Sequence, residues 1–562
     1  MHWNIKDTPN KETITHLIDC LGIDAVVAQL LAQRNITSFE SAKAFFRPHI
    51  GQLHDPFLMQ DMETAVSRLQ KAIDQKETVM VYGDYDVDGT TSVSLLTHFL
   101  RSQGLNVTPY IPDRYAEGYG LSKKGIDTAK AANISFMIAL DCGVKAIEQV
   151  AYANSLGIDL IICDHHTPGD VLPNALAILD PKRSDCAYPF KELCGCGVGF
   201  KLMQALLQQQ GKDVSDIIAY LDFVAVAIAA DIVPMVGENR TLAFLGLQQL
   251  NAHPRPGLKA LMRDKPTAQI ISDVVFGMAP RINAAGRMKH GLHAVELLLS
   301  ATDEEAQKRA QEVEIYNTSR REVEQEITKE ALTQITENQE ENNAANVVYA
   351  PHWHKGVIGI VASRLIESYY RPTLVFTKSK EGILAASARS VRGFDVYKAI
   401  DACSRHIIQF GGHKYAAGVT LKEENYQAFK AAFEAQVAQT LTATQKAQTL
   451  DVDVALPFTA ITPKLLRILK QMEPFGPENS SPVFYTDGVV DSGYAKLVGQ
   501  DKSHIKARFV QGASSPIDAI GFGLGKKMNL LKKGTPLRIA YALEENVWQG
   551  NVSVQLRLKD IE

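Results

Sequence analysis

The sequence predicts an α/β protein of several domains, and three observations support this fold class. Between residues 78 and 180, short apolar runs of β-type residues alternate with helical patterns, which is typical of a mainly parallel sheet. Residues 301–343 are charged and rich in Glu with helical spacing, and they predict one long helical linker. After residue 449, short β-type runs lie between turns rich in Gly, Ser and Lys, and they predict a small barrel.

The length and charge of the chain limit what it can be. Its 562 residues allow about three or four domains, each with a core of its own. A net charge of −4 excludes a bulk polycation. Any nucleic-acid partner would therefore be held by local basic patches.

The N-terminus and the cysteines indicate a cytoplasmic protein. Residues 1–6 carry no positively charged lead into an apolar segment, and no apolar run approaches the length that spans a membrane. The 7 cysteines, scattered through apolar runs and loops, fit reduced thiols better than a disulfide framework. Cys194-Gly-Cys196 is spaced too closely for a zinc knuckle, so we expect structural thiols there.

Changes of pattern along the chain predict five segments. Amphipathic helical patterns at 13–33 and 38–46 come first, and no chemistry is visible in them. We expect a helical N-terminal lead-in (1–60), a parallel-sheet catalytic domain (61–300), a connecting helix (301–344), a second α/β domain (345–445) and a C-terminal barrel of OB type (449–562).

The most informative stretch follows the first predicted strand, residues 79–82. Asp84, Asp86 and Asp88 stand at alternate positions before a helical pattern. In open α/β sheets this edge is where ligands bind, and three carboxylates so close repel one another unless cations or protons neutralise them. The stretch predicts a divalent metal site, although an acidic turn without function remains an alternative for this stretch alone.

A calcium-binding EF-hand loop is a poor match for the same stretch. The spacing Asp84-x-Asp86-x-Asp88-Gly89 opens like such a loop, but its twelfth position is Leu95, where a bidentate Glu is needed. A strand also precedes it, in place of a helix.

Further metal-ligand residue types follow the next strands. Asp141 comes after residues 136–140, and Asp164-His-His166 comes after residues 160–163. Asp231 ends an apolar run that periodicity assigns to neither helix nor strand. A buried carboxylate without a partner is costly, so we expect Asp231 to meet a cation.

These residues resemble the four motifs of the DHH phosphoesterase superfamily. The motifs are Asp84-Tyr-Asp-Val-Asp-Gly89, Asp141-Cys-Gly143, Asp164-His-His166 and Ala230-Asp231. The wider context, including Pro280-Arg-Ile-Asn-Ala-Ala-Gly-Arg287 and Gly411-Gly-His413, resembles the RecJ family of single-stranded-DNA exonucleases. The resemblance spans nearly the whole chain.

The resemblance implies a pair of divalent cations and assigns their ligands. Asp84 and Asp86 would hold one ion, Asp88, His165 and Asp231 the other, and Asp141 would bridge them. Asp84 stands where many members of the superfamily have a histidine. Because the set is rich in oxygen and poor in imidazole, it favours Mn²⁺ or Mg²⁺ over zinc. Two such ions suit hydrolysis of a phosphodiester.

The two remaining residues of the third motif would act beside the ions. In an extended segment, neighbouring side chains point to opposite sides, so we expect His166 to point away from His165. We assign His166 to the scissile phosphate or leaving group, as an electrostatic stabiliser or general acid. Asp164 would orient an imidazole.

Cationic and polar residues elsewhere are candidates for holding the substrate. Arg114 lies in a loop rich in Gly and Tyr, and Arg281, Asn283 and Arg287 lie in a predicted loop. By resemblance to the DHHA1 subfamily, Ser387 and Arg389 on a predicted strand and His413 in a glycine-rich bend at 410–418 would contact nucleic-acid phosphates. A bidentate Arg with a hydroxyl donor could recognise a terminal 5′-phosphate. A polar strand face without function is the alternative for Ser387 and Arg389.

The C-terminal block combines cations with aromatic side chains. OB-folds track single strands through charge and stacking, without sequence choice. The residues concerned are Lys496, Lys502, His504, Lys506, Arg508, Phe509, Phe522, Lys526, Lys527, Lys532, Lys533 and Trp548.

The leading hypothesis is a metal-dependent 5′-to-3′ exonuclease for single-stranded DNA that releases 5′-mononucleotides in repair or recombination. Expected partners are single-stranded DNA and, beyond it, a helicase and a single-strand-binding protein, with the enzyme itself a monomer. A phosphodiesterase for cyclic dinucleotides or short oligonucleotides is the first alternative, and the barrel argues against it. An inactive DNA-binding scaffold is the second, and the retained ligands argue against that.

Overall fold

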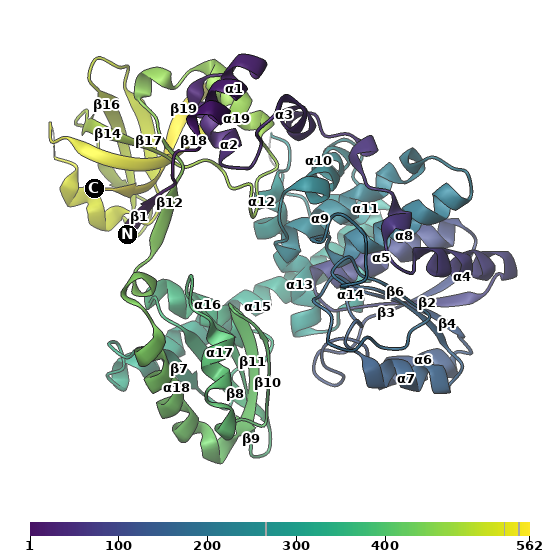
Figure 1. Cartoon of the computed structure of the whole chain (residues 1–562). Coiled ribbons are helices and arrows are strands. Elements are labelled where there is room, and N and C mark those ends of the chain that lie inside the picture. Colours follow the sequence, from purple (N-terminus) through teal and green to yellow (C-terminus); the bar gives the residue numbers. More distant parts are fainter. Residues whose placement is uncertain (265–266, 533, 549–550) are drawn as a thin grey trace. The chain divides into compact units, whose positions relative to one another are not determined.

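A computed structural model describes the backbone of residues 1–264, 267–532, 534–548 and 551–562, and the side chains of these residues except 547, 548, 551 and 552. The chain forms two compact units, which are described separately. The smaller unit contains Met1–His2, Arg281–His293 and Lys308–Thr449, and the larger unit contains Trp3–Pro280, Ala294–Gln307 and Leu450–Glu562. Figure 1 labels the helices and strands.

A parallel sheet of five strands lies in the larger unit, in the order β3-β2-β4-β5-β6. All of its pairings are parallel, as the alternation of β-type and helical runs predicts. The carboxyl ends of its strands therefore meet at one edge. The strands are β2 (Thr78–Gly83), β3 (Asn106–Tyr110), β4 (Phe136–Leu140), β5 (Asp159–Cys163) and β6 (Ala177–Leu179).

Helices cover both faces of this sheet (Figure 1). Apolar residues of α6 and α7, such as Ile126 and Val150, form one buried cluster with Met80 and Met137 of the strands. On the other face, α5 packs against β2, and α8 packs against β4 and α5. The helices of this domain are α4 (Met62–Gln75), α5 (Val87–Ser102), α6 (Lys123–Ala131), α7 (Ile147–Ser155), α8 (Gly195–Gln209), α9 (Leu221–Asp231) and α10 (Gly237–Ala252).

The apolar run that ends at Asp231 is a helix, α9. Its residues from Leu221 to Ala229 are all buried, and α5 and α10 pack against it. A helix that is apolar on every side shows no amphipathic period, because no side of it faces water. This is why periodicity left the run unassigned.

The C-terminal strands close into a barrel. Strand β14 pairs with β18 and also with β16, which completes a ring through β19 and β17. The pair β17–β19 is parallel and the other pairs of the ring are antiparallel. This confirms the predicted OB-type barrel. Its strands are β14 (Phe484–Asp491), β16 (His504–Gln511), β17 (Ile517–Gly521), β18 (Leu537–Trp548) and β19 (Asn551–Ile561).

The N-terminal helices share the core of this barrel, although they lie at the opposite end of the sequence. Leu17 and Leu31 are buried in the same apolar cluster as Phe484 and Ile539. Strand β1 (His2–Ile5) pairs with β12 (Thr449–Val452). The helices are α1 (Lys11–Leu21), α2 (Ala25–Ala32) and α3 (Phe39–Phe46).

Among the residues that the structure describes, no single helix is both long and apolar enough to cross a membrane. Helices α1 and α2 meet the length and composition criteria only when taken together, as a pair bent by 118°.

The smaller unit holds a mixed sheet in the order β10-β11-β9-β8-β7. The pair β7–β8 is parallel, and the other pairs are antiparallel. Helix α16 (Ile358–Ser368) packs on β8 and β9, and α15 (Asp303–Glu337) is the predicted long helix that leads into this unit. The strands are β7 (Asn346–Tyr349), β8 (Thr373–Lys380), β9 (Ile383–Arg389), β10 (Gln409–His413) and β11 (Ala416–Lys422).

Two local predictions are wrong. The glycine-rich bend at 410–418 is the β10–β11 hairpin, in which the backbones of Gly411 and Gly418 are paired. The predicted loop at 280–287 belongs to helix α13 (Ala279–Met288). Pro280 lies just after a π-helical turn, Val274–Met278, and the helical run continues through the proline at this widened turn.

Candidate metal centre and substrate-binding residues

The first three candidate ligands lie where β2 leads into α5, with Asp84 and Asp86 before the helix and Asp88 in its first turn. Asp86 caps α5, because its side chain accepts a hydrogen bond of 3.1 Å from the N–H of Gly89. A Cβ at position 89 would lie 2.3 Å from the carbonyl oxygen of Asp84. Only glycine therefore lets the first turn of α5 approach this backbone so closely.

The other candidate ligands come from three further elements. Asp141 follows β4, His165 follows β5, and Asp231 ends α9. Three groups have ligand atoms within 4.8 Å of one another: Asp84 with Asp86 and Asp141; Asp88 with His165 and Asp231; and Asp141 with His165 and His166.

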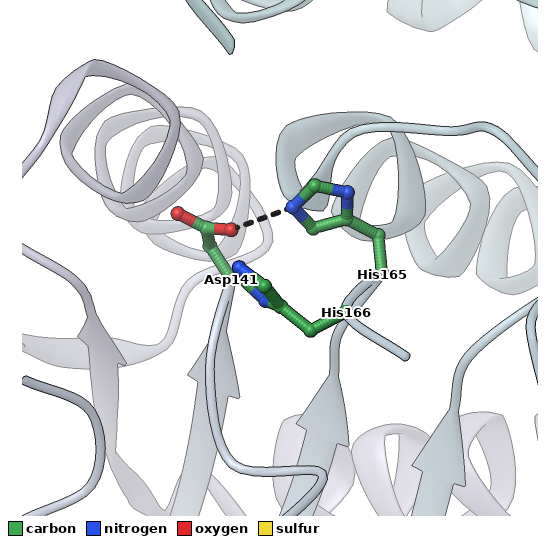
Figure 2. Close-up of side chains that lie close together, drawn as sticks. All are labelled: Asp141, His165 and His166. Carbon is green, nitrogen blue, oxygen red and sulfur yellow. Dashed lines mark hydrogen bonds and ion pairs between the residues drawn. The ribbon is translucent and has the colours of Figure 1, made fainter. Parts of the chain in front are cut away.

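His165 lies at the centre of the cluster. Its Nε2 is 3.1 Å from Asp141 Oδ1, 3.6 Å from Asp231 Oδ2 and 3.8 Å from Asp88 Oδ2. Figure 2 shows Asp141 and the two histidines beyond the carboxyl ends of neighbouring strands, with His165 facing Asp141. The fold thus brings all six predicted metal ligands to one edge of the sheet.

The electrostatics of the cluster fit divalent cations. Burial and the nearby Asp86 raise the pKa of Asp88 to about 7, and burial with the charge of Asp88 raises the pKa of Asp231 to about 8. Burial and like charge also raise the pKa of Asp84 and of Asp141. Asp84 Oδ1 is buried without a hydrogen-bond partner in the described part of the chain. Cations would relieve the repulsion and satisfy this oxygen.

The prediction that His166 points away from His165 is wrong. Asp164 Oδ1 accepts hydrogen bonds from the backbone N–H groups of both His165 and His166, at 2.8 and 3.2 Å. This turn replaces the extended conformation that the prediction assumed. The two imidazole rings consequently lie on the same side, with centroids 4.5 Å apart.

The two neighbouring histidines have opposite electrostatic environments. Burial and the adjacent His166 lower the pKa of His165 to about 3. Burial disfavours the charged form of His166 too, but its 2.7 Å hydrogen bond from Nδ1 to Asp164 raises its pKa to about 9. His165 is therefore neutral and able to offer a nitrogen to a metal ion, while His166 is a cation at neutral pH.

Tyr119 lies beside His166, and Arg114 lies beside Tyr85, next to the first candidate ligand. The hydroxyl of Tyr119 is 3.0 Å from His166 Nε2, in the loop between Gly118 and Gly120. The guanidinium of Arg114 lies 4.3 Å from the ring centre of Tyr85, and its charge lowers the pKa of Asp84 against the larger effect of burial. The sequence indicates a Tyr-rich loop here but not the contact between Tyr119 and His166.

In the smaller unit, Ser387 and Arg389 form a compact pair on β9. Arg389 Nη1 donates to Ser387 Oγ at 3.0 Å. Gly359, near the start of α16, is so close that a Cβ there would lie 2.8 Å from Ser387 Oγ and 3.0 Å from Arg389 Nη2. A hydroxyl, a guanidinium and a helix N-terminus thus meet at one point of this unit.

His413 lies on the same face of that sheet. Ala416 is paired with both Arg389 and His413, so the side chains of these residues project from one face. Gly418 is paired with Ser387 on one side and with Gly411 on the other. Because neither glycine has a side chain, no side chain covers the sheet next to Ser387 at these two positions.

Arg281 and Asn283 lie on α13, and the helix replaces the predicted loop around them. Arg281 forms an ion pair with Glu314 of α15, and Arg287 Nη1 donates to the carbonyl oxygen of Gly356 at 2.9 Å. Arg281 is thus paired with a carboxylate within the smaller unit, an arrangement the sequence did not indicate.

Cations and aromatic rings meet at two places on the barrel. The ring of Tyr494 lies 5.1 Å from both Arg508 and Lys496, and Phe522, which is 55% exposed, contacts His504 and Arg557. Phe509 is buried in the core, so its predicted role in stacking is wrong, because it faces inward on β16. Lys533 and the side chain of Trp548 lie outside the described residues.

All 7 cysteines have free thiols, as expected for reduced cysteines. The segment Cys194-Gly195-Cys196, whose thiols are predicted to be structural, lies beside the candidate metal centre through its backbone. The N–H groups of Gly195 and Cys196 donate to Asp88 Oδ2 and Oδ1 at 2.7 and 2.8 Å. No pattern of residue types in the sequence signals these backbone contacts.

Three family models match the chain. The N-terminal domain of the DHH family matches residues 78–228, the DHHA1 domain matches residues 342–439, and the RecJ OB domain matches residues 452–560. A parallel sheet whose edge gathers carboxylates and histidines, followed by a second α/β domain, defines a DHH phosphoesterase with a DHHA1 domain.

Individual relatives narrow this class. The chain is 36% identical to the single-stranded-DNA-specific exonuclease RecJ of Bacillus subtilis, over 100% of this chain and 70% of the relative. It is 33% identical to RecJ of Dickeya dadantii, over 97% of each chain. The chain belongs to the RecJ family.

Solved structures agree with this membership. The crystal structure of Thermus thermophilus RecJ in complex with Mn²⁺ superimposes with a TM-score of 0.85 and 27% identity, over 100% of this chain and 79% of that one. The corresponding Mg²⁺ complex superimposes with a TM-score of 0.78 and 26% identity, over 100% and 78% of the two chains.

The raised carboxylate pKa values predict how metal and pH act together. In the metal-free protein, the folded state keeps protons on Asp88 and Asp231 that the unfolded state has released, so stability falls as pH rises through about 7 and about 8. Bound Mn²⁺ replaces these protons. We therefore expect Mn²⁺ to raise the unfolding temperature more at about pH 8 than at about pH 6.

Thermal unfolding of chelator-treated protein, with and without Mn²⁺ at both pH values, measures this difference. The variant Asp88→Asn should show a smaller dependence on pH. An equal metal-induced shift at both pH values would contradict the prediction.

Proposed function

We propose that this chain is a metal-dependent exonuclease that hydrolyses single-stranded DNA from the 5′ end and releases 5′-mononucleotides. The convergence of six carboxylate and imidazole ligands at one sheet edge, with raised carboxylate pKa values, is the observation that carries the proposal. Membership of a family whose named relatives are single-stranded-DNA-specific exonucleases supports the substrate.

In this proposal the six ligands hold two divalent cations, Mn²⁺ or Mg²⁺. Asp84 and Asp86 would hold one ion, Asp88, His165 and Asp231 would hold the other, and both ions would share Asp141. Asp84 and Asp86, like Asp88, His165 and Asp231, have ligand atoms within 4.8 Å of one another. Solved structures of Thermus thermophilus RecJ contain Mn²⁺ and Mg²⁺. When bound, such ions supply a nucleophile at neutral pH and neutralise the phosphoryl oxygens.

His166 is the proton donor in the proposed reaction. The hydrogen bond of 2.7 Å between Asp164 Oδ1 and His166 Nδ1 fixes the orientation of the ring. The proton on His166 Nε2 therefore points away from Asp164 and toward the Tyr119 hydroxyl. A phosphodiester seated over the carboxylate cluster can take the place of the Tyr119 hydroxyl and accept this proton at its leaving oxygen. Arg114, stacked on Tyr85, supplies a fixed positive charge beside Asp84 for the phosphate.

The smaller unit supplies the site for the end of the strand. Ser387, Arg389 and the N-terminus of α16 converge and offer donors to a terminal 5′-phosphate, and His413 lies on the same sheet face. Arg281 and Asn283 of α13 are further contacts for the phosphates. Arg281 would leave its ion pair with Glu314 and bind a phosphate in its place. Recognition of one end explains a fixed polarity.

The barrel holds the strand away from the reacting end. Tyr494 and Phe522, each beside cationic side chains, can stack on bases without regard to sequence. A long substrate needs such a surface, whereas a cyclic dinucleotide does not. The barrel therefore favours the exonuclease over the dinucleotide phosphodiesterase.

The biological setting is part of the same proposal. An enzyme that requires single strands needs a source of them, so we expect it to act after a helicase and on strands covered by a single-strand-binding protein. A monomer acting in the cytoplasm, in DNA repair and recombination, fits this substrate.

Replacing the bridging ligand tests the catalytic assignment. Asp141→Ala should abolish Mn²⁺-dependent degradation of a 5′-phosphorylated single strand, a loss of at least about 10³-fold, because both ions lose a ligand. Degradation of end-labelled strands, with the label at the 5′ or the 3′ end, measures rate and polarity together.

The variant Asp170→Ala, which removes an exposed carboxylate, is the matched control and should keep wild-type activity. Unfolding curves show whether Asp141→Ala remains folded. Wild-type activity in folded Asp141→Ala would remove the two-metal assignment, and release of nucleotides from the 3′ end would remove the polarity.

Arg389 tests the recognition of the strand end. A charge-assisted hydrogen bond contributes about 1.5–3 kcal/mol, so Arg389→Ala should slow hydrolysis of 5′-phosphorylated strands by about 10- to 100-fold. It should affect 5′-hydroxyl strands far less. The measurement is kcat/KM on both substrates.

Lys422→Ala, an exposed cation at the end of β11, controls for the loss of general positive charge on this unit. Equal losses of kcat/KM on the two substrates with Arg389→Ala would show that Arg389 does not bind the terminal phosphate.

A further inference from the structure

We propose that the first turn of α8 positions two carboxylates of the metal centre, and that Gly195 is the positioning residue on which their separation depends. The inference deepens the proposed function and rests on it, because it takes Asp88 and Asp141 to be metal ligands. It assigns a role to a segment that carries no ligand of its own.

Backbone groups of α8 hold both oxygens of Asp88. Gly195 N–H donates to Oδ2 at 2.7 Å, and Cys196 N–H donates to Oδ1 at 2.8 Å. The carboxylate is 1% exposed, so these N–H groups replace water as its solvation. Two fixed donors leave the carboxylate a single orientation, and the positive end of the helix favours its ionised form.

The same residue sets the position of Asp141. A Cβ at Gly195 would lie 2.6 Å from Asp141 Cβ, 2.8 Å from its Cα and 3.0 Å from its Oδ1. Asp141 has little freedom to retreat, because its φ is 58° and its N–H donates to the carbonyl oxygen of Cys163 at 2.9 Å. Any side chain at position 195 must therefore displace one of the two carboxylates.

One residue thus fixes the distance between two proposed ligands that come from different elements, the first turn of α5 and the end of β4. Its N–H binds Asp88, and its Cα hydrogens pack against Asp141. Cys194 supports the arrangement as the cap of α8, since its sulfur accepts a hydrogen bond of 3.3 Å from the N–H of Gly197. A glycine that served packing alone would leave metal affinity unaffected when replaced.

The matched pair Gly195→Ala and Gly197→Ala tests this role. A Cβ at Gly197 would meet Leu193 and Cys194 only at ordinary contact distances of 3.4–3.7 Å, so this variant carries the same change within the same helical turn. Mn²⁺ titration, followed by the electron paramagnetic resonance of the free ion, measures affinity without relying on activity.

We expect Gly195→Ala to weaken Mn²⁺ binding about 10- to 100-fold, as loss of support for metal ligands does. Gly197→Ala should bind Mn²⁺ as the wild type does. Raising the Mn²⁺ concentration should restore part of the nuclease activity of Gly195→Ala.

The variant Asp88→Asn distinguishes a failure of the positioning role of Gly195 from a failure of the metal-ligand assignment. Wild-type Mn²⁺ affinity in Gly195→Ala, with lost affinity in Asp88→Asn, would overturn the inference and leave the proposed function intact. Wild-type affinity in Asp88→Asn would overturn the ligand assignment itself.

Should Gly195→Ala not fold, Cys196→Pro removes the N–H that reaches Asp88 Oδ1 at a position in the first helical turn that accepts proline. Unchanged Mn²⁺ affinity in folded Cys196→Pro would also overturn the inference.

Discussion

Repulsion among buried carboxylates is the constraint on which this structure depends. Asp84, Asp88 and Asp141 are almost fully buried beside one another, which no protein tolerates without protons or cations. The parallel sheet creates the crowding, because it brings the carboxyl ends of its strands to one edge. The N–H of Gly89 holds Asp86, and the N-terminus of α8 holds Asp88, so part of the arrangement that cations need is already formed.

The two adjacent histidines show how position decides chemistry at this edge. His165 has Nε2 among three carboxylates, where a cation can take the place of a proton, whereas His166 is paired with Asp164 and keeps its proton. Burial acts on both rings, and only the partner differs. A neutral imidazole and a charged one therefore arise from neighbouring residues of the same type.

Much of this could be predicted from the sequence, because strand-terminal residues of a parallel sheet share one edge whatever the details of packing. The candidate residues at the strand ends, the two α/β domains, the long helix and the barrel follow from local patterns, whereas the assignment of ligands to two ions came from the family resemblance. The rest depends on contacts between distant residues or on turn geometry. No local sequence pattern indicates that α9 and α13 are helices or that His166 lies beside His165. Nor does any local pattern indicate that α1–α3 pack into the barrel or that Gly195 contacts Asp141.

The most direct test of the central claim is the anomalous scattering of manganese in crystals of this protein grown or soaked with Mn²⁺. The account predicts two peaks about 3.5–4 Å apart. Asp141 should lie between them, with Asp84 and Asp86 at one peak and Asp88, His165 and Asp231 at the other. A single peak, or peaks away from these side chains, would contradict it.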